Sequence, residues 1–166
     1  MYQLKTYQKK VLVDTLTPVS IYQKIRDNFS NSILLESSDY GANDNSYAYI
    51  CFNPVSHISI KNLNIEIKYP DKSESFEIKK GRDVIDQINS FCKSFKCTVD
   101  NKKFINNGVF GYTNYDSVKY FEDIEIDSNN DSIDIPDIYY AFYSNIIVIN
   151  VFNNEAVIYN HSFKTQ

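Results

Sequence analysis

This sequence lacks several of the features that mark well-known classes of protein. Its four glycines, at positions 41, 81, 108 and 111, are spaced too widely for a G-x-G-x-x-G motif or a P-loop, which excludes a glycine-rich nucleotide-binding loop. No run approaches the roughly 18 uninterrupted apolar residues of a membrane helix, and the N-terminal residues lack the apolar core of a signal peptide. We therefore expect a cytoplasmic protein with no membrane association.

Metal-binding and redox motifs are missing as well. The three cysteines, Cys51, Cys92 and Cys97, show no C-x-x-C spacing, and we expect them to be reduced, small buried hydrophobes. The two histidines, His57 and His161, lie in no H-E-x-x-H or H-x-E arrangement, and we expect surface or packing roles for both. The residues therefore predict no catalytic apparatus, metal site or cofactor in this chain.

The charge of the chain excludes a further class. Its formal net charge is −4, its sequence pI is about 5.1, and its basic residues form no long run, so the positive patch of a nucleic-acid-binding protein is missing. An acidic stretch at residues 122–137 contains Asp127, Asp131 and Asp134 but lacks the D-x-[DN]-x-[DN]-G pattern and distal Glu of a calcium loop. We expect a solvated loop there and no nucleic-acid partner.

The sequence is rich in aromatic residues. Of its 166 residues 43% are hydrophobic, and 14 tyrosines and 11 phenylalanines make up an aromatic share of 15%. This composition is typical of a β-rich core, and a chain of this length buries roughly 68–70% of its unfolded surface, enough for a core without disulfides. We expect residues 1–166 to form a single globular domain.

Alternation of apolar and polar residues predicts several strands. In residues 63–69 the alternation is strict, as in an antiparallel strand near a sheet edge with one wet face. Residues 75–78 follow a turn and are expected to pair back on that strand. Further strands are expected at residues 32–37, 46–52, 109–113 and 138–152, with a closing hairpin through Asn153 and Asn154 into residues 156–159.

Helical spacing of apolar residues predicts two helices. Thr17 and Pro18 begin the first, because Thr caps free backbone N–H groups and Pro fits the first helical position; apolar residues then recur at helical spacing up to Phe29. The second begins near Arg82, with an apolar stripe made of Val84, Ile85, Ile88, Phe91, Cys92 and Phe95. Residues 115–121 are expected to form a short helix or turn. The predicted fold class is α+β, with largely antiparallel β-sheets and flanking helices.

Two segments place polar residues at the edge of apolar stretches. Residues 36–39, Glu-Ser-Ser-Asp, directly follow an expected strand, and Tyr115 and Asp116 follow the Gly-Val-Phe-Gly-Tyr sequence at residues 108–112. A carboxylate with hydroxyls at the mouth of a β core could bind the amino group of a small amphipathic ligand, because a desolvated ammonium needs such acceptors. A helix cap or a strand-end turn is the alternative interpretation of residues 36–39.

The same segments carry a resemblance to a known family. Leu-Leu-Glu-Ser at residues 34–37 and Phe-Gly-Tyr-x-x-Tyr-Asp at residues 110–116 share the family's order and spacing, and residues 17–22, 46–50, 121–123, 135–137 and 146–150 also match. Over most of its length the sequence resembles the N-terminal region of anthranilate synthase component I, a chorismate-using enzyme of tryptophan biosynthesis.

The resemblance implies a layered sandwich of β-sheets flanked by helices, of which this chain would supply one part. It also implies part of a feedback site for L-tryptophan, which here would use Leu35, Glu36 and Ser37, with Ser38 as a neighbour. We expect Glu36 or nearby carbonyls to bind the ammonium group and Ser37 to orient the amino acid. Leu35 and Tyr49 would contact the indole ring.

In the family, the chorismate- and magnesium-binding residues lie in a larger C-terminal part, and a glutamine amidotransferase partner delivers ammonia. The resemblance therefore implies that this chain forms no anthranilate alone and holds no cofactor, Mg²⁺ being used by the full-length enzyme. Two alternatives remain: the corresponding part of aminodeoxychorismate synthase component I, and a stand-alone module that binds an amino acid without a catalytic half. An aromatic-rich β module for a sugar or peptide fits the composition, but the motif order contradicts it.

Overall fold

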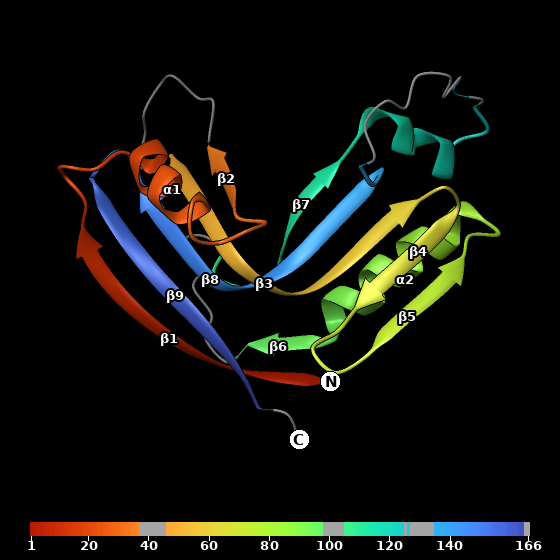
Figure 1. The fold of residues 1–166 in the computed structure, drawn as a ribbon, viewed down its shortest axis with the longest axis horizontal. Coiled ribbons are helices and arrows are strands. Elements are labelled where there is room, and N and C mark those ends of the chain that lie inside the picture. The colour runs from red at the N-terminus through yellow and green to blue at the C-terminus, as the bar shows by residue number, and fades with distance from the viewer. Residues whose placement is uncertain (37–45, 98–104, 125, 127–134, 165–166) are drawn as a thin grey trace. The chain divides into compact units, whose positions relative to one another are not determined.

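A computed structural model of the chain describes residues 1–36, 46–97, 105–124, 126 and 135–164. These residues form nine β-strands, two α-helices and one short 3₁₀ helix (Figure 1). In chain order the elements are β1 (Tyr2–Leu12), α1 (Pro18–Arg26), β2 (Ile33–Glu36), β3 (Tyr47–Lys61), β4 (Asn64–Lys68), β5 (Ser73–Glu77), α2 (Gly81–Lys93), β6 (Phe95–Cys97), β7 (Val109–Thr113), η1 (Tyr115–Tyr120), β8 (Ile138–Asn150) and β9 (Glu155–Lys164).

The strands are hydrogen-bonded in the order β5-β4-β3-β8-β9-β1-β6, with β2 added on β3 and β7 added on β8. The hairpins β3–β4, β4–β5 and β8–β9 are antiparallel, as are the pairs β2–β3, β7–β8 and β1–β9, whereas β6 runs parallel to β1. The predicted α+β class with largely antiparallel sheet is confirmed.

The described residues pack into two compact units. Unit 1 comprises those of Met1–Pro54, Phe95–Gly108 and Tyr143–Gln166, and unit 2 comprises those of Val55–Ser94 and Val109–Phe142. The strands β3 and β8 each contribute residues to both units. The expectation of a single domain stays a prediction, because this division describes packing and not independent folding.

In unit 1, α1 begins where the sequence predicts. Thr17 caps it: the Thr17 hydroxyl accepts a hydrogen bond from Ser20 N at 3.1 Å, and Ser20 Oγ accepts one from Thr17 N at 3.0 Å. The helix ends at Arg26, so Phe29 lies beyond it and packs its ring against Phe52, with the centroids 4.9 Å apart. The apolar face of α1 covers a core made of Val13, Ala48, Ile50, Ile147, Ile149 and Ala156.

β1, which no sequence pattern predicted, pairs with β9 from Gln3 opposite Lys164 to Leu12 opposite Glu155. The strand is rich in lysine, glutamine and tyrosine, and most of its side chains are exposed. It therefore shows little of the apolar alternation that reveals a half-buried strand. The predicted hairpin through Asn153 and Asn154 is confirmed, and β9 extends it beyond the predicted four residues.

In unit 2, α2 is confirmed, but its buried face is narrower than the predicted stripe. Val84 and Phe91 are buried, and the Phe91 ring packs on Tyr69 with the centroids 5.8 Å apart. Ile85 is 49% exposed and Cys92 is also exposed, so the prediction of buried side chains at these two positions is wrong. Phe95 lies outside the helix, in β6, because α2 ends at Lys93.

The hairpin between β3 and β4 corrects one strand boundary. Lys61 pairs with Asn64, which leaves Asn62 and Leu63 as a two-residue turn with φ of +48° and +61°. Such a turn matches the twist of the flanking strands. Leu63, predicted as the first strand residue, therefore lies in the turn and is 57% exposed. The strand after it and its pairing with β5 are confirmed.

Gly111 in β7 has no room for a side chain. A Cβ atom there would lie 1.8 Å from the backbone oxygen of Tyr139 on β8. We expect Gly111→Ala to lower the free energy of unfolding by about 3 kcal/mol, because a backbone oxygen in a sheet cannot move aside. Urea denaturation followed by circular dichroism would measure this loss.

Gly108→Ala is the matched control. Gly108 has a φ of +152°, which disfavours a side chain, but the nearest atom to a Cβ at this position would be Ile105 Cγ2 at 3.8 Å. The control should therefore lose less stability than Gly111→Ala, and an equal or larger loss would contradict the steric explanation.

Candidate functional site

Strand register decides which of the predicted effector residues share a face in unit 1. Leu35 on β2 lies opposite Tyr49 on β3, and side chains directly opposite in an antiparallel pair project from the same face. Glu36 lies opposite Ala48 and so projects from the other face, which packs against α1. The structure thus brings Leu35 and Tyr49 together and places Glu36 on the opposite side of the strand.

The Leu35–Tyr49 pair is partly exposed to solvent. Leu35 is 39% exposed, Tyr49 is half-buried, and the Glu36 side chain is exposed at the last residue of β2. Ser37 and Ser38, the other two predicted effector residues, lie outside the described residues. An apolar side chain beside an aromatic ring suits contact with another flat, apolar group.

The Tyr49 hydroxyl is tied to a distant segment of the chain. It accepts a hydrogen bond from Ile105 N at 3.3 Å. Burial raises the pKa of Tyr49, with smaller contributions from Tyr47, Cys51 and Tyr159, while the bond from Ile105 opposes the rise. The phenol therefore stays protonated at neutral pH. No local sequence pattern indicates its contact with Ile105.

Cys51, two residues along β3 from Tyr49, is fully buried, as predicted for this cysteine. Burial raises the pKa of its thiol far above the usual range, so Cys51 is a packing residue and not a nucleophile. The side chain of Cys97 lies outside the described residues.

His161 on β9 is buried, with 2% of its surface exposed, so its predicted packing role is confirmed. Its Nε2 lies 2.9 Å from the backbone oxygen of Asn106, and its Nδ1 lies 2.8 Å from Thr6 Oγ1. A carbonyl oxygen only accepts, so we assign the proton to Nε2, and Nδ1 then accepts from the Thr6 hydroxyl. Burial lowers the pKa of His161, although the bond to Asn106 opposes this, and the ring stays neutral at neutral pH.

Unit 2 contains most of the second predicted segment, which forms β7 and continues through Tyr115 and Asp116 into η1. The Tyr112 ring stacks on Tyr139 with the centroids 6.2 Å apart, and Tyr139 stacks on His57 with the centroids 5.4 Å apart. Burial, with a smaller contribution from Lys68, lowers the pKa of His57. His57 is half-buried and packs against a ring, in agreement with its predicted role. Tyr115 is largely exposed.

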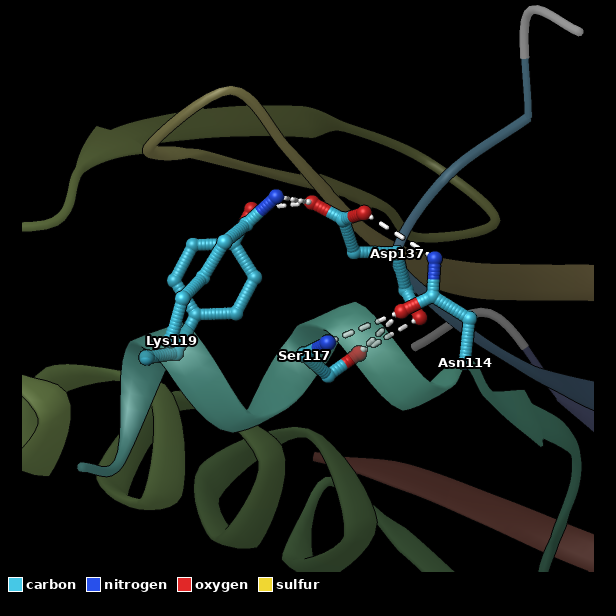
Figure 2. A network of polar contacts seen from close by, with 5 residues as sticks. Asn114, Ser117, Lys119 and Asp137 are labelled. Atoms are coloured by element: carbon cyan, nitrogen blue, oxygen red, sulfur yellow. Dashed lines mark hydrogen bonds and ion pairs between the residues drawn. The ribbon is translucent and has the colours of Figure 1, made fainter. Parts of the chain in front are cut away.

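A network of polar contacts links η1 to the start of β8 in the same unit (Figure 2). The Asp137 carboxylate accepts hydrogen bonds from Asn114 Nδ2 at 3.0 Å and from the Tyr120 hydroxyl at 2.5 Å, and it lies 3.0 Å from Lys119 Nζ. Ser117 Oγ donates to the backbone oxygen of Asp137 at 2.8 Å. Asn114 also caps η1, because its side-chain oxygen accepts from Ser117 N at 2.9 Å.

Asp137 corrects the prediction of a solvated loop over residues 122–137. The residue is 8% exposed, whereas Asp127, Asp131 and Asp134 lie outside the described residues. Burial by itself would raise its pKa, but the bonds from Tyr120, Lys119 and Asn114 outweigh burial, and the pKa is lowered. Burial and the neighbouring carboxylate raise the pKa of Tyr120. With its oxygens occupied by donors, this carboxylate holds η1 in place and is poorly suited to act as a base.

The described part of the chain offers no site for a metal ion. No group of three or more His, Cys, Asp or Glu side chains with suitable geometry occurs among the residues that the structure describes. Among the same residues, no helix is long and apolar enough to cross a membrane.

Comparison with known proteins finds homologues of this chain. A comparison with family models found no match. Curated proteins do match: anthranilate synthase component 1 of Aquifex aeolicus is 32% identical over 151 residues, which cover 90% of this chain and 29% of that relative. The Pseudomonas putida protein of the same name is 29% identical over 147 residues, covering 85% of this chain and 28% of that relative. This chain is a homologue of the N-terminal part of anthranilate synthase component I.

The fold agrees with this assignment. The crystal structure of anthranilate synthase component I from Streptococcus pneumoniae matches with a TM-score of 0.51 and 17% identity, covering 89% of this chain and 30% of that one. At this identity the likeness concerns the fold alone. The chain spans under a third of the length of these anthranilate synthase relatives.

The Asp137 network makes a prediction about stability in this anthranilate synthase homologue. We expect Asp137→Asn to lower the free energy of unfolding at pH 7 by about 2–3 kcal/mol, because it removes the charge that Lys119 and two neutral donors contact. Urea denaturation of both proteins would measure the difference. Asp86→Asn is the control, because Asp86 is an exposed partner of Arg82 at 3.7 Å and should matter little.

The same network predicts a pH dependence. The pKa of Asp137 is lower in the folded protein than the value of about 3.9 in an unfolded chain, so its stabilisation is present above that value and lost as the pH falls below it. The stability difference between wild type and Asp137→Asn should therefore shrink as the pH is lowered from about 5 to 3. A difference that stays constant over this range would contradict the pKa direction.

Proposed function

We propose that this chain is the regulatory N-terminal part of anthranilate synthase component I and carries part of its feedback site for L-tryptophan. The observation that carries the proposal is the pairing of Leu35 with Tyr49, which sets an accessible apolar and aromatic surface in the segment whose sequence resembles the family's effector motif. The homology to anthranilate synthase component I supports the same assignment.

The geometry of β2 suggests how the two ends of tryptophan would be bound. The indole would lie on the face that Leu35 and Tyr49 share, where burial of apolar area favours it. Glu36 projects from the opposite face at the end of β2, so its carboxylate would reach the ammonium group around the strand end. Backbone carbonyls near Glu36 could accept from the ammonium as well, and Ser37 with Ser38 would orient the amino acid.

In the complete enzyme, this part would act with a larger C-terminal part and a glutamine amidotransferase. Together they would convert chorismate and glutamine to anthranilate, pyruvate and glutamate in the cytoplasm, with Mg²⁺ held by the C-terminal part. Tryptophan would inhibit by binding more tightly to an arrangement in which the active site is not formed. The chain alone should then form no anthranilate from chorismate and ammonia.

Titration of L-tryptophan into the ¹⁵N-labelled chain tests the proposal. We expect amide shifts that cluster at Leu35, Glu36 and Tyr49, because these residues line the proposed half-site. D-tryptophan and L-phenylalanine are the control ligands and should cause smaller shifts. If L-tryptophan causes no stereospecific shift, either with the chain alone or after the C-terminal part of a relative is added, the proposed effector site is wrong.

A substitution on the shared face adds a quantitative test. Leu35→Ala should weaken binding of L-tryptophan about tenfold, because the shortened side chain buries less apolar area against the indole. Leu16→Ala is the matched control, since Leu16 is similarly exposed but is not part of β2 or β3. The same Kd for wild type and Leu35→Ala would remove Leu35 from the site.

A further inference from the structure

We propose that His161 is a positioning residue for the Tyr49 ring and acts through residues 105 and 106. The structure links Thr6, His161, the Asn106 carbonyl, the Ile105 amide and the Tyr49 hydroxyl in one series of contacts within unit 1. The identity of the ligand at Tyr49 rests on the proposed function, but the positioning role does not.

The first step is the contact that fixes the Tyr49 ring. A tyrosine ring on a sheet face can rotate and tilt unless its hydroxyl is held, and here Ile105 N donates to that hydroxyl at 3.3 Å. Ile105 lies far from Tyr49 in sequence and belongs to no helix or strand. The position of the ring therefore depends on what holds the Ile105 backbone.

The second step is the contact that holds this backbone. The carbonyl oxygen of Asn106, the next residue, accepts from His161 Nε2 at 2.9 Å, and Asn106 is itself buried. One end of the Ile105–Asn106 pair is thus bound by Tyr49 and the other by His161. A buried hydrogen bond of this kind is costly to leave unmade, which keeps the pair in place.

The third step is the orientation of the imidazole. His161 pairs with Thr6 across β9 and β1, and the Thr6 hydroxyl lies 2.8 Å from Nδ1. The ring also stacks on Tyr159 of the same strand, with an interplanar angle of 6° and the centroids 6.4 Å apart. The Asn106 carbonyl fixes the proton on Nε2, and the Thr6 hydroxyl then donates to Nδ1 and holds the ring in the orientation that the Asn106 contact needs.

His161 thereby has a role beyond filling space. Any ligand that packs on the Leu35–Tyr49 surface would meet a ring that is already oriented, and it would lose less conformational freedom on binding. His161 would then raise affinity without touching the ligand.

The test without ligand compares His161→Phe with His161→Gln. Phenylalanine fills the space but cannot donate to Asn106, whereas glutamine can donate to Asn106 and accept from Thr6. In the ¹⁵N-labelled chain, His161→Phe should speed hydrogen exchange of the Ile105 amide about fivefold and shift the Tyr49 ring resonances, and His161→Gln should restore wild-type behaviour. Unchanged Ile105 exchange and Tyr49 resonances in a folded His161→Phe protein would overturn the proposal.

Two further variants keep the test decisive if His161→Phe does not fold. Thr6→Val removes the hydroxyl at Nδ1 and should speed Ile105 exchange, and Tyr49→Phe should do so by removing the acceptor. His57→Phe is the matched control, because His57 stacks on Tyr139 in unit 2 and should leave Ile105 unchanged. If Thr6→Val alters neither Ile105 nor the Tyr49 ring, the proposal is also overturned.

Titration of L-tryptophan separates this proposal from the proposed function. Weaker binding to His161→Phe, by about fivefold, with near wild-type binding to His161→Gln, would support both. Equal binding to wild type and His161→Phe would overturn the effect of His161 on affinity and leave the effector site standing. If no protein binds L-tryptophan, the effector site fails, and the exchange measurements still decide the role of His161.

Discussion

The register of β2 on β3 is the constraint on which the candidate site depends. In a β-strand a shift of one residue moves every side chain to the other face, so this register alone decides that Leu35 meets Tyr49. The register is held from the opposite face, where Leu34 and Ile50 pack with α1. A slipped strand would expose such side chains, each of which contributes roughly 1.5–3 kcal/mol when fully buried. The core beneath α1 thereby sets the chemistry of the face on the other side.

Two buried polar side chains, His161 and Asp137, hold segments outside the sheet in place through hydrogen bonds. In unit 1, His161 on β9 binds the backbone at Asn106. In unit 2, Asp137, the residue before β8, accepts hydrogen bonds from Asn114, which caps η1, and from Tyr120 at the end of η1. Both groups have their hydrogen-bonding atoms in contact with partners, as buried polar groups require. Irregular segments have no ladder of backbone hydrogen bonds, so a few such side chains determine where they lie.

The sequence predicted the elements whose signals are local. The helix cap at Thr17, the apolar–polar alternation in β4 and the apolar periodicity of α2 each arise within a few neighbouring residues. The corresponding elements α1, β4 and α2 are all present. β1 was not predicted because its side chains are mostly exposed. The burial of Asp137 was not predicted because its hydrogen-bond partners lie about 20 residues away in the sequence. The contact of Tyr49 with Ile105 spans 56 residues and has no local pattern at all. For the candidate effector site, therefore, the sequence motif at residues 34–37 could be predicted. The placement of Leu35 and Glu36 on opposite faces of β2 could not.

Among the strands that the structure describes, β5 lies at one end of the sheet, and its sequence is Ser-Glu-Ser-Phe-Glu. The outer edge of such a strand carries backbone groups that another chain could pair with. Here a second copy that approached edge to edge would bring the exposed carboxylate of Glu77 toward its partner, in a protein that already carries a net negative charge, whereas Glu74 is paired with Lys72. The composition of this short strand therefore disfavours aggregation through the edge of the sheet.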